Sequence, residues 1–363
     1  LSNLSRALGG LDGIFHEHDD GHGAHPAGNR RDGADLGLHL VKENVAQKAV
    51  GRAVDAHVDD NGALFDGLAI TKCGEEILSH QQQYPVIFLT LKSAKQDTYA
   101  LAYMELKKRL SAEYKRHKYV LMGDTLTADE KERFEAVSRV ADDDSLYTDA
   151  LGFLSECLSR YHGHNAFILI DEYDVPLENA YLHGFYDKMI GFIRSLFESA
   201  LKTNPYLEKG VITGCLRISK ESVFTGLNNL AVESILSMNY PGAFGFTEPE
   251  VKAMMEYFDR ADQYPELKKW YDGYCLGECH IYNPIAVVNL VTKGKFKSYW
   301  SETGTYEAIV PLLNMDFEGL KTAIIEMLGG SRAEIDVSSF QNDMVSFANR
   351  DDVLTYLIHL GYL

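Results

Sequence analysis

The sequence lacks a long apolar segment and lacks an excess of positive charge. Within its 363 residues no run of about 18 uncharged apolar residues occurs, and no basic segment followed by an apolar one opens the chain. We therefore expect neither a membrane-spanning helix nor a signal peptide, and we expect a cytoplasmic protein. Lys plus Arg total 35 against 53 Asp plus Glu, and the net charge of −18 disfavours docking onto anionic membrane or nucleic-acid phosphates.

Cysteine is scarce, which excludes a disulfide scaffold. The five cysteines, at positions 73, 157, 215, 275 and 279, are an odd number in apolar surroundings, and this pattern is typical of reduced thiols. Cys275, Cys279 and His280 suggest a metal site, but a structural zinc site needs four ligands and no second cluster accompanies them.

Aromatic residues are almost absent from residues 1–63, where Phe15 stands alone. The same stretch holds ten of the 30 glycines and six of the 13 histidines. The histidines of "HEHDDGHGAH" (16–25) could hold a divalent metal loosely, or the segment is polar with no fixed ligand geometry. We leave residues 1–63 as an unassigned Gly/His/Asp-rich leader, with one weak strand signal in "LGLHLV" (36–41) and a short helix after it.

From residue 64 the pattern is that of an α/β domain. Apolar, β-branched runs predict buried strands at 84–91, 166–170 and 210–216, and apolar residues at helical spacing predict helices through 99–114, 147–158 and 185–200. Strands that alternate with helices predict a mostly parallel sheet with helices on both faces.

After about residue 245 the strand signals thin out. Thr247 and Glu250 have the spacing of a capping box that opens a helix. Further helices are predicted at 264–272, 284–291, 304–313, 316–328 and 352–360. We therefore predict an α/β core over 64–245 and a smaller helical, winged-helix-like domain over 246–363.

Two carboxylates end the strand in "FILIDEYDVP" (167–176). Ligands of parallel sheets bind beyond the carboxyl ends of the strands, so Asp171 and Glu172 are candidates for holding Mg²⁺ and for activating water in phosphate chemistry. A capping or salt-bridging acid pair is the alternative. After the next strand, Thr213 and Arg217 offer a hydroxyl for a water or nucleotide and a guanidinium for phosphate oxygens. Taken by themselves, Arg217 and Lys220 are better explained as ordinary surface charges.

Together these segments resemble the bacterial AAA-ATPase-like family, a branch of the P-loop ATPases whose members often carry a C-terminal PD-(D/E)XK nuclease-like domain. The resemblance covers about residues 64–363. It rests on the blocks "LFDGLAI", "YPVIFLTLKS", "ILIDEYDVPLENAY", "FYDKMIGFIRSLFESALKTN", "VITGCLRISKESVFTGLNNL", "FGFTEPEV" and "KKWYDGYCLGECHIYNP".

The resemblance implies Mg²⁺-dependent binding and hydrolysis of ATP coupled to a conformational switch. Asp171 and Glu172 match the Walker B pair, for magnesium and for water activation respectively. Thr213 matches the first polar sensor, and Arg217 matches an arginine that reads the γ-phosphate. "WYDGY" and "YNP" (270–274 and 282–284) match the lid region and carry no chemical role that we can derive, so we expect them to be packing residues.

One part of the family pattern is missing. A phosphate-cradling loop needs glycines, a lysine and a following Ser or Thr, and neither "NRRDGADLG" (29–37) nor "KGKFKS" (293–298) provides them. In this ATPase class the strand before that loop lies centrally, beside the sensor strand, so its loss would leave a gap in the sheet. We therefore expect impaired catalysis, and the alternative function is a non-catalytic protein-interaction module that keeps the ATPase fold.

Nuclease activity is not expected from this chain. Its Glu-x-Lys triplets, such as Glu105 with Lys107, lie on predicted helices and follow no strand-borne Asp. A nucleic-acid-binding role for residues 246–363 is disfavoured by their acidic, lysine-poor character. The partners that we expect are a nucleotide and, as a further possibility, another protein.

Overall fold

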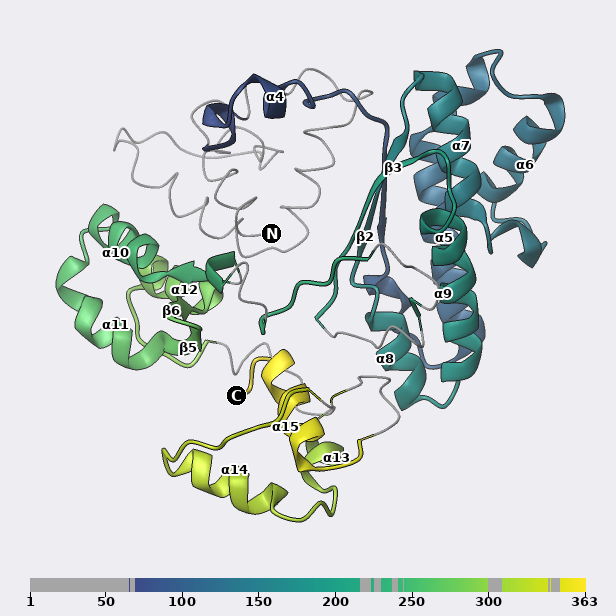
Figure 1. Ribbon diagram of the computed structural model, residues 1–363. Coiled ribbons are helices and arrows are strands. Elements are labelled where there is room, and N and C mark those ends of the chain that lie inside the picture. The colour runs from purple at the N-terminus through teal and green to yellow at the C-terminus, as the bar shows by residue number, and fades with distance from the viewer. Residues whose placement is uncertain are drawn as a thin grey trace, which may run out of the picture. The chain divides into compact units, whose positions relative to one another are not determined.

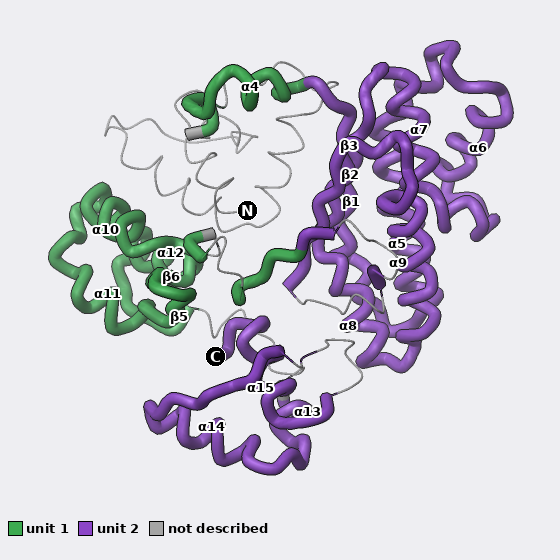
Figure 2. Tube along the Cα trace, in the orientation of Figure 1, with its two compact units in different colours: residues 1–82, 232–305 green, residues 83–231, 306–363 purple. Residues whose placement is uncertain are grey.

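The computed structural model divides the chain into two compact units (Figure 2), of which unit 1 comprises residues 1–82 and 232–305 and unit 2 comprises residues 83–231 and 306–363. The residues that the structure describes are 65, 69–215, 223–224, 230–236, 241–243, 245–299, 309–338, 340 and 347–363. The C-terminal segment thus falls in the unit that holds the parallel sheet, whereas the boundaries that we expected from the sequence lie at 63/64 and 245/246. Those boundaries stay a prediction.

Unit 2 is built on a parallel sheet of three strands in the order β1-β2-β3. The strands are β1 (Val86–Thr90), β2 (Ala166–Asp171) and β3 (Leu207–Ile212). The parallel arrangement predicted from the sequence is confirmed. β3 begins three residues before the predicted 210–216 and ends at Ile212, so Thr213 follows the strand directly.

Five helices connect these strands (Figure 1). They are α5 (Tyr99–Arg116), α6 (Ala128–Ser138), α7 (Ala150–His162), α8 (Val175–Leu182) and α9 (Tyr186–Leu201). The predicted helices through 99–114, 147–158 and 185–200 are confirmed. α6 was not predicted, although Thr127 and Glu130 form a full capping box at its start, and α8 was missed because it is only eight residues long.

The long helices α5, α7 and α9 lie together on one face of the sheet (Figure 1). When each successive strand joins the same edge of a parallel sheet, right-handed crossovers place all the connecting helices on one face. The order β1-β2-β3 follows the chain in this way and never reverses. The described residues therefore place the long helices on one face, where the sequence predicted both. The core beneath them includes Ile87, Leu106, Leu154, Ile168, Ile170, Ile193 and Leu196.

β3 differs from its neighbours because it is poorly covered. Residues 208–211 are exposed, and Val211 keeps 41% of its surface accessible. Among the residues that the structure describes, β3 pairs only with β2, so its other side is an edge of the described sheet. This is the edge at which the family resemblance implies a further strand.

Three helices near the C-terminus complete unit 2, namely α13 (Ile309–Leu313), α14 (Leu320–Leu328) and α15 (Arg350–His359). Leu312, Leu320, Val353 and Leu354 join the same core as the sheet helices. The helices predicted at 316–328 and 352–360 are confirmed with shifted starts. Of the helix predicted at 304–313, residues 309–313 are helical and the first five lie outside the described residues.

Unit 1 contains a second, antiparallel sheet in the order β4-β6-β5. Its described helices and strands are α4 (Glu75–Leu78), β4 (Phe246–Thr247), α10 (Glu248–Tyr257), α11 (Tyr264–Tyr271), β5 (Asp272–Leu276), β6 (Cys279–Tyr282) and α12 (Pro284–Lys293), with 3₁₀ turns at η2 (Ala69–Lys72), η6 (Pro241–Ala243) and η7 (Ala261–Gln263). The capping box of Thr247 and Glu250 is confirmed. The β5–β6 hairpin was not predicted, because its alternation of half-buried and exposed residues is carried by few β-branched side chains.

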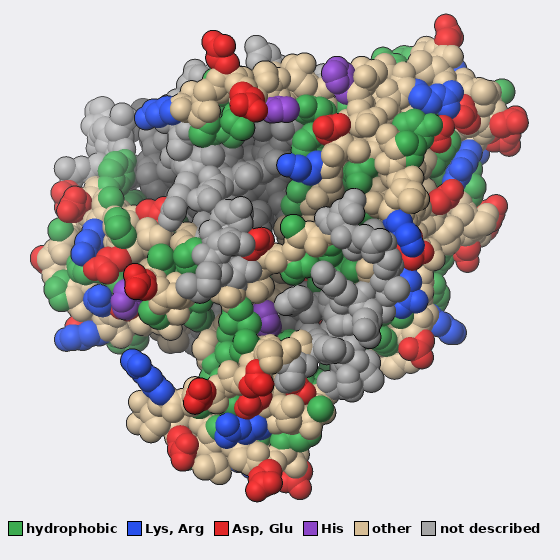
Figure 3. Space-filling model, in the orientation of Figure 1, with side chains coloured by type: hydrophobic (Ala, Val, Ile, Leu, Met, Phe, Trp, Pro, Cys, Tyr) green, Lys and Arg blue, Asp and Glu red, His purple; other side chains and the backbone are tan. Residues whose placement is uncertain are grey.

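Other sequence predictions lie outside the described residues. They include the strand at 36–41, the helix after it and the histidine cluster at 16–25. In the described part of the chain, no helix combines the length and the apolar character needed to span a membrane. On the face seen in Figure 3, acidic and basic side chains are interspersed and no large basic patch forms. All five cysteines are free thiols.

Candidate active site

Asp171 lies at the carboxyl end of β2 and is 5% exposed. Its Oδ1 accepts a hydrogen bond of 2.9 Å from the Thr213 hydroxyl. Its Oδ2 is buried and has no hydrogen-bond partner among the described residues. Because buried polar atoms are nearly always paired, this oxygen marks a position where a ligand is expected.

Thr213 reaches Asp171 because the chain after β3 stays tied to the end of β2. The Thr213 amide donates to the Ile170 carbonyl at 2.9 Å, and the Thr213 carbonyl accepts from the Tyr173 amide at 3.1 Å. Gly214 follows in close contact, since a Cβ at this position would lie 2.6 Å from Asp174 Oδ1 and 2.7 Å from the Tyr173 ring. A glycine is thus required for the two loops to approach this closely.

Glu172 turns away from Asp171. Its backbone has a φ of 51°, a left-handed conformation that is strained for a residue with a side chain. Its Oε1 accepts from Lys92 Nζ at 3.2 Å, and the Glu172 side chain is 12% exposed while the Lys92 side chain is 61% exposed. The two neighbouring carboxylates therefore occupy separate surroundings, one beside a hydroxyl and one beside an ammonium group.

The structure brings together Asp171 and Thr213, as the sequence predicts, and places Glu172 next to them on the other side of β2. Arg217 and Lys220 lie outside the described residues. Lys92 was missed in the sequence, yet it follows β1 closely at the same edge of the sheet. Lys92 could have been found by looking for charged residues just past the end of each predicted parallel strand.

The surroundings of Asp171 fit a magnesium ion. Mg²⁺ prefers oxygen ligands and is commonly held in phosphate sites by one or two carboxylates, with phosphates and water completing its shell. A carboxylate oxygen that pairs with no described residue, beside a hydroxyl, meets that requirement. Over the described ranges no three His, Cys, Asp or Glu side chains gather into a metal site of their own, so an ion here would depend on a bound phosphate for its remaining ligands.

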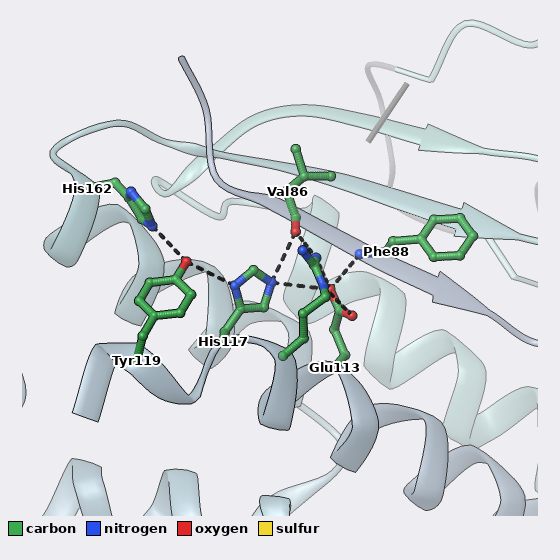
Figure 4. Close-up of polar contacts among 7 residues, drawn as sticks. Val86, Phe88, Glu113, His117, Tyr119 and His162 are labelled. Atoms are coloured by element: carbon green, nitrogen blue, oxygen red, sulfur yellow. Dashed lines mark hydrogen bonds and ion pairs between the residues drawn. The ribbon is translucent and has the colours of Figure 1, made fainter. Parts of the chain in front are cut away.

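A second buried polar cluster lies at the amino end of the same sheet (Figure 4), and it is fully paired. Glu113 Oε1 accepts from the Phe88 amide at 2.8 Å, from Arg116 at 2.5 Å and from His117 at 3.3 Å. His117 Nε2 also faces the Val86 carbonyl at 3.1 Å. Since both neighbours are acceptors, this nitrogen carries a proton and donates.

The cluster continues through Tyr119, whose hydroxyl lies 3.1 Å from His117 Nδ1 and 2.8 Å from His162 Nε2. It therefore ties α5 to β1 and to the end of α7. Burial raises the pKa of the Glu113 carboxyl, but hydrogen bonds from His117 and Arg116 outweigh burial and hold that pKa at about 2. Because both oxygens of this carboxylate accept hydrogen bonds, we assign the cluster a structural role.

The motifs "WYDGY" and "YNP" have structural roles in unit 1. The Tyr271 hydroxyl donates to the Lys297 carbonyl at 2.9 Å, and Asp272 pairs with His280 at 3.1 Å. Tyr282 is fully buried, and its hydroxyl lies 3.0 Å from that of Tyr264. The Asn283 side chain caps α12 by accepting from the amides of residues 285 and 286, with Pro284 at the first helical position.

Comparisons with known proteins bear on the region of the parallel sheet. Residues 50–224 match the model of a family described as "Predicted AAA-ATPase". A protein of Azotobacter chroococcum mcd 1, named "Uncharacterized protein in vnfD 5'region", is 32% identical over 152 residues, which is 42% of this chain and 29% of that protein. The matched part is thus less than a third of the relative's length. No solved structure matches the chain.

Proposed function

Because residues 50–224 belong to the AAA-ATPase-like family, we propose that this chain binds Mg²⁺-ATP at the carboxyl edge of its parallel sheet and hydrolyses it slowly. The observation that carries the proposal is the buried Asp171 carboxylate, which accepts from the Thr213 hydroxyl with one oxygen, while its other oxygen has no hydrogen-bond partner among the residues that the structure describes. A carboxylate in this state is unfavourable in a protein that binds nothing there.

Each residue at the edge receives a role in the proposal. Asp171, with Thr213 beside it, would hold Mg²⁺, which when bound neutralises negative charge on phosphate oxygens. Glu172 orients a water and accepts its proton, since a carboxylate next to the metal site is the available base. Thr213 orients the water or the terminal phosphate, and Arg217 pairs with phosphate oxygens.

The absence of a Gly-Lys-Ser/Thr loop from the sequence limits the expected rate. Such a loop supplies backbone N–H groups and a lysine to the phosphates, and without it binding depends on the acidic edge and Arg217. The same absence favours the second candidate function, a protein-interaction module that keeps the fold and has lost nucleotide. The two candidates differ in whether Mg²⁺-ATP binds.

Calorimetric titration of the full chain with Mg²⁺-ATP tests the proposal. We expect saturable binding that Asp171→Asn and Arg217→Ala each weaken at least about tenfold, which corresponds to roughly 1.4 kcal/mol. Asp187→Asn, which removes an exposed carboxylate at the start of α9, is the matched control and should bind as the wild type does. No heat at millimolar nucleotide would refute the ATPase proposal and favour the interaction module.

The roles that we propose for the remaining parts of the chain rest on the resemblance to the AAA-ATPase-like family. We propose that the helices α10, α11 and α12 with the β5–β6 hairpin form a winged-helix-like lid. A protein partner is a further proposed element of the switch. A cytoplasmic location fits the free thiols. Nucleic acid is not among the proposed ligands, because the net charge is −18.

A further inference from the structure

Three cations that pair with no described carboxylate gather at one place in unit 1. None of the ion pairs among the described residues of this unit involves Arg260, Lys293 or Lys295. Three other lysines of the same stretch do pair with carboxylates, namely Lys252, Lys268 and Lys269. In a chain whose net charge is −18, positive groups that lack a carboxylate from the described residues are suited to an anion from outside.

Gly294 brings these three cations together. It ends α12 with a φ of 67° and stands between the two lysines, whose side chains are exposed. A Cβ on Gly294 would lie 2.7 Å from Arg260 Nη2 and 3.1 Å from Arg260 Nη1, so the guanidinium rests against the backbone between Lys293 and Lys295. The C-terminus of α12 carries about half a negative charge, which offsets only a small part of three positive charges.

An aromatic surface adjoins the cations. Phe296 directly follows Lys295, and the centroid of its ring lies 6.1 Å from that of Trp270. Trp270 is 48% exposed, and its Nε1 donates to Glu266 Oε1 at 3.0 Å, which holds the indole in place on α11. An exposed tryptophan beside an arginine is the composition that dominates the binding energy of protein interfaces.

Two buried tyrosines hold the backbone of this surface from inside. The Tyr271 hydroxyl donates to the Lys297 carbonyl at 2.9 Å and accepts from the Lys297 amide at 3.0 Å. The Tyr299 hydroxyl donates to the Lys295 carbonyl at 2.7 Å, and the Tyr299 ring lies 5.5 Å from Lys293 Nζ. Because the backbone is already fixed, a ligand would order only side chains, which lowers the entropic cost of binding.

The chemistry of this surface fits a short acidic peptide segment. Carboxylates complement the three cations, and an apolar side chain next to them can pack on the exposed indole. A nucleic acid or an anionic membrane extends farther than the Debye length of about 10 Å. Either would also meet the exposed carboxylates of Glu256 and Asp262 beside Arg260, which a segment of a few residues need not approach.

We propose that Arg260, Lys293, Lys295, Trp270 and Phe296 form a docking face for an acidic segment of a partner protein. Carboxylates of the segment pair with the cations, and an apolar side chain of the segment packs on Trp270 and Phe296. The inference does not depend on nucleotide binding. It applies to an ATPase and to a non-catalytic interaction module alike.

Fluorescence anisotropy of a labelled peptide, Asp-Glu-Asp-Phe-Glu-Asp-Glu, titrated with the full chain tests this. We expect saturable binding that Lys295→Glu weakens at least about fivefold, because a repulsion replaces an attraction. Lys72→Glu reverses the same charge at an exposed position of unit 1, in η2, and should weaken binding by less than about twofold. Absence of binding at millimolar concentrations, or an equal loss in the two variants, would overturn the inference.

Trp270 provides a second readout that a purely electrostatic attraction would not give. Replacing the phenylalanine of the peptide by alanine should weaken binding to wild type about three- to tenfold. The same replacement should leave binding to Trp270→Ala unchanged, because the contact has already been removed. An equal effect in wild type and Trp270→Ala would overturn the inference. So would a single-stranded oligothymidylate that binds more tightly than the peptide and is weakened by the same variants, since the face would then belong to nucleic acid.

Discussion

The two ends of the β1-β2-β3 sheet both bury a carboxylate, and they treat it in opposite ways. At the amino end, Glu113 is 7% exposed and its oxygens accept from a backbone amide, an arginine and a histidine. At the carboxyl end, Asp171 is 5% exposed and one of its oxygens has no hydrogen-bond partner in the described part of the chain. The first arrangement stabilises the fold, whereas the second is costly unless a ligand completes it.

Backbone geometry follows the same division. The amino-end residues of Figure 4 lie in β1, in α5 and the turn that follows it, and at the end of α7, and none of them has a positive φ. The carboxyl end holds Glu172 at a φ of 51° and packs Gly214 against Tyr173. Strain tends to concentrate where a structure is arranged for function, and under the proposed function the strained carboxyl end is the part that would bind a ligand.

The largest expected effect comes from breaking the paired end. Glu113→Ala leaves Arg116, His117 and the Phe88 amide without their common acceptor, and we expect the free energy of unfolding to fall by roughly 3–5 kcal/mol. Urea unfolding measures this loss. Glu105→Ala on the same helix removes only an exposed pair with Lys108 and should change stability by less than about 1 kcal/mol; a similar loss in both variants would contradict the assignment.

Acid should act on the same end of the sheet. The pKa of Glu113 lies at about 2 in the folded protein, against an ordinary value of 4.5, so its contribution is fully present above pH 4.5 and is lost as the pH falls toward 2. The contribution is on the order of 3 kcal/mol. Between pH 5 and pH 2 the free energy of unfolding should decline less steeply in Glu113→Gln than in wild type. Identical slopes would contradict a stabilising role for the Glu113 carboxylate.

A smaller loss is expected from crowding the carboxyl end. Gly214→Ala places a Cβ within 2.7 Å of Asp174 and the Tyr173 ring, which should lower the free energy of unfolding by about 1–3 kcal/mol and weaken Mg²⁺-ATP binding by displacing Thr213. Gly191→Ala lies in α9 with open space around it and should be neutral or slightly stabilising. Unchanged nucleotide binding in Gly214→Ala would show that the position of Thr213 does not matter.

The smallest expected effect is a gain in stability, and it tests the comparison between the two ends of the sheet most sharply. Glu172→Gly relieves the left-handed backbone, so we expect the free energy of unfolding to rise by about 1 kcal/mol while hydrolysis is lost. Thr203→Gly, at a φ of 52° beyond the end of α9, should give a similar gain with hydrolysis intact. Thermal unfolding and ATPase assays of both variants separate backbone strain from function.

Much of the sheet was predictable from the sequence because its strands are apolar runs with sharp ends. "FILID" predicts β2 and the position of Asp171 correctly, since buried parallel strands read as continuous apolar segments. The helices that pack through regular apolar stripes, such as α5 and α9, were predictable for the same reason. The β5–β6 hairpin was not, because half-exposed strands with charged and cysteine residues give a weak alternation.

The candidate site was predictable only in part. Asp171 and Thr213 follow apolar strands directly, and parallel pairing brings them to one edge. The turn of Glu172 toward Lys92 depends on a backbone torsion that no spacing rule encodes, and the network from Glu113 to His162 joins residues up to 49 positions apart through tertiary contacts. Sequence patterns give the edge of the sheet on which residues lie, whereas side-chain directions come from packing.

The central claim is that Asp171 at the carboxyl end of the sheet destabilises the ligand-free fold and binds a ligand. Thermal unfolding of wild type and Asp171→Asn, with and without Mg²⁺-ATP, tests this claim most directly. Without ligand, Asp171→Asn should be as stable as wild type or more stable by up to about 1 kcal/mol, because a buried charge is removed. Mg²⁺-ATP should raise the Tm of wild type and leave that of Asp171→Asn unchanged. A clear loss of stability in ligand-free Asp171→Asn, together with no effect of Mg²⁺-ATP on wild type, would contradict the account.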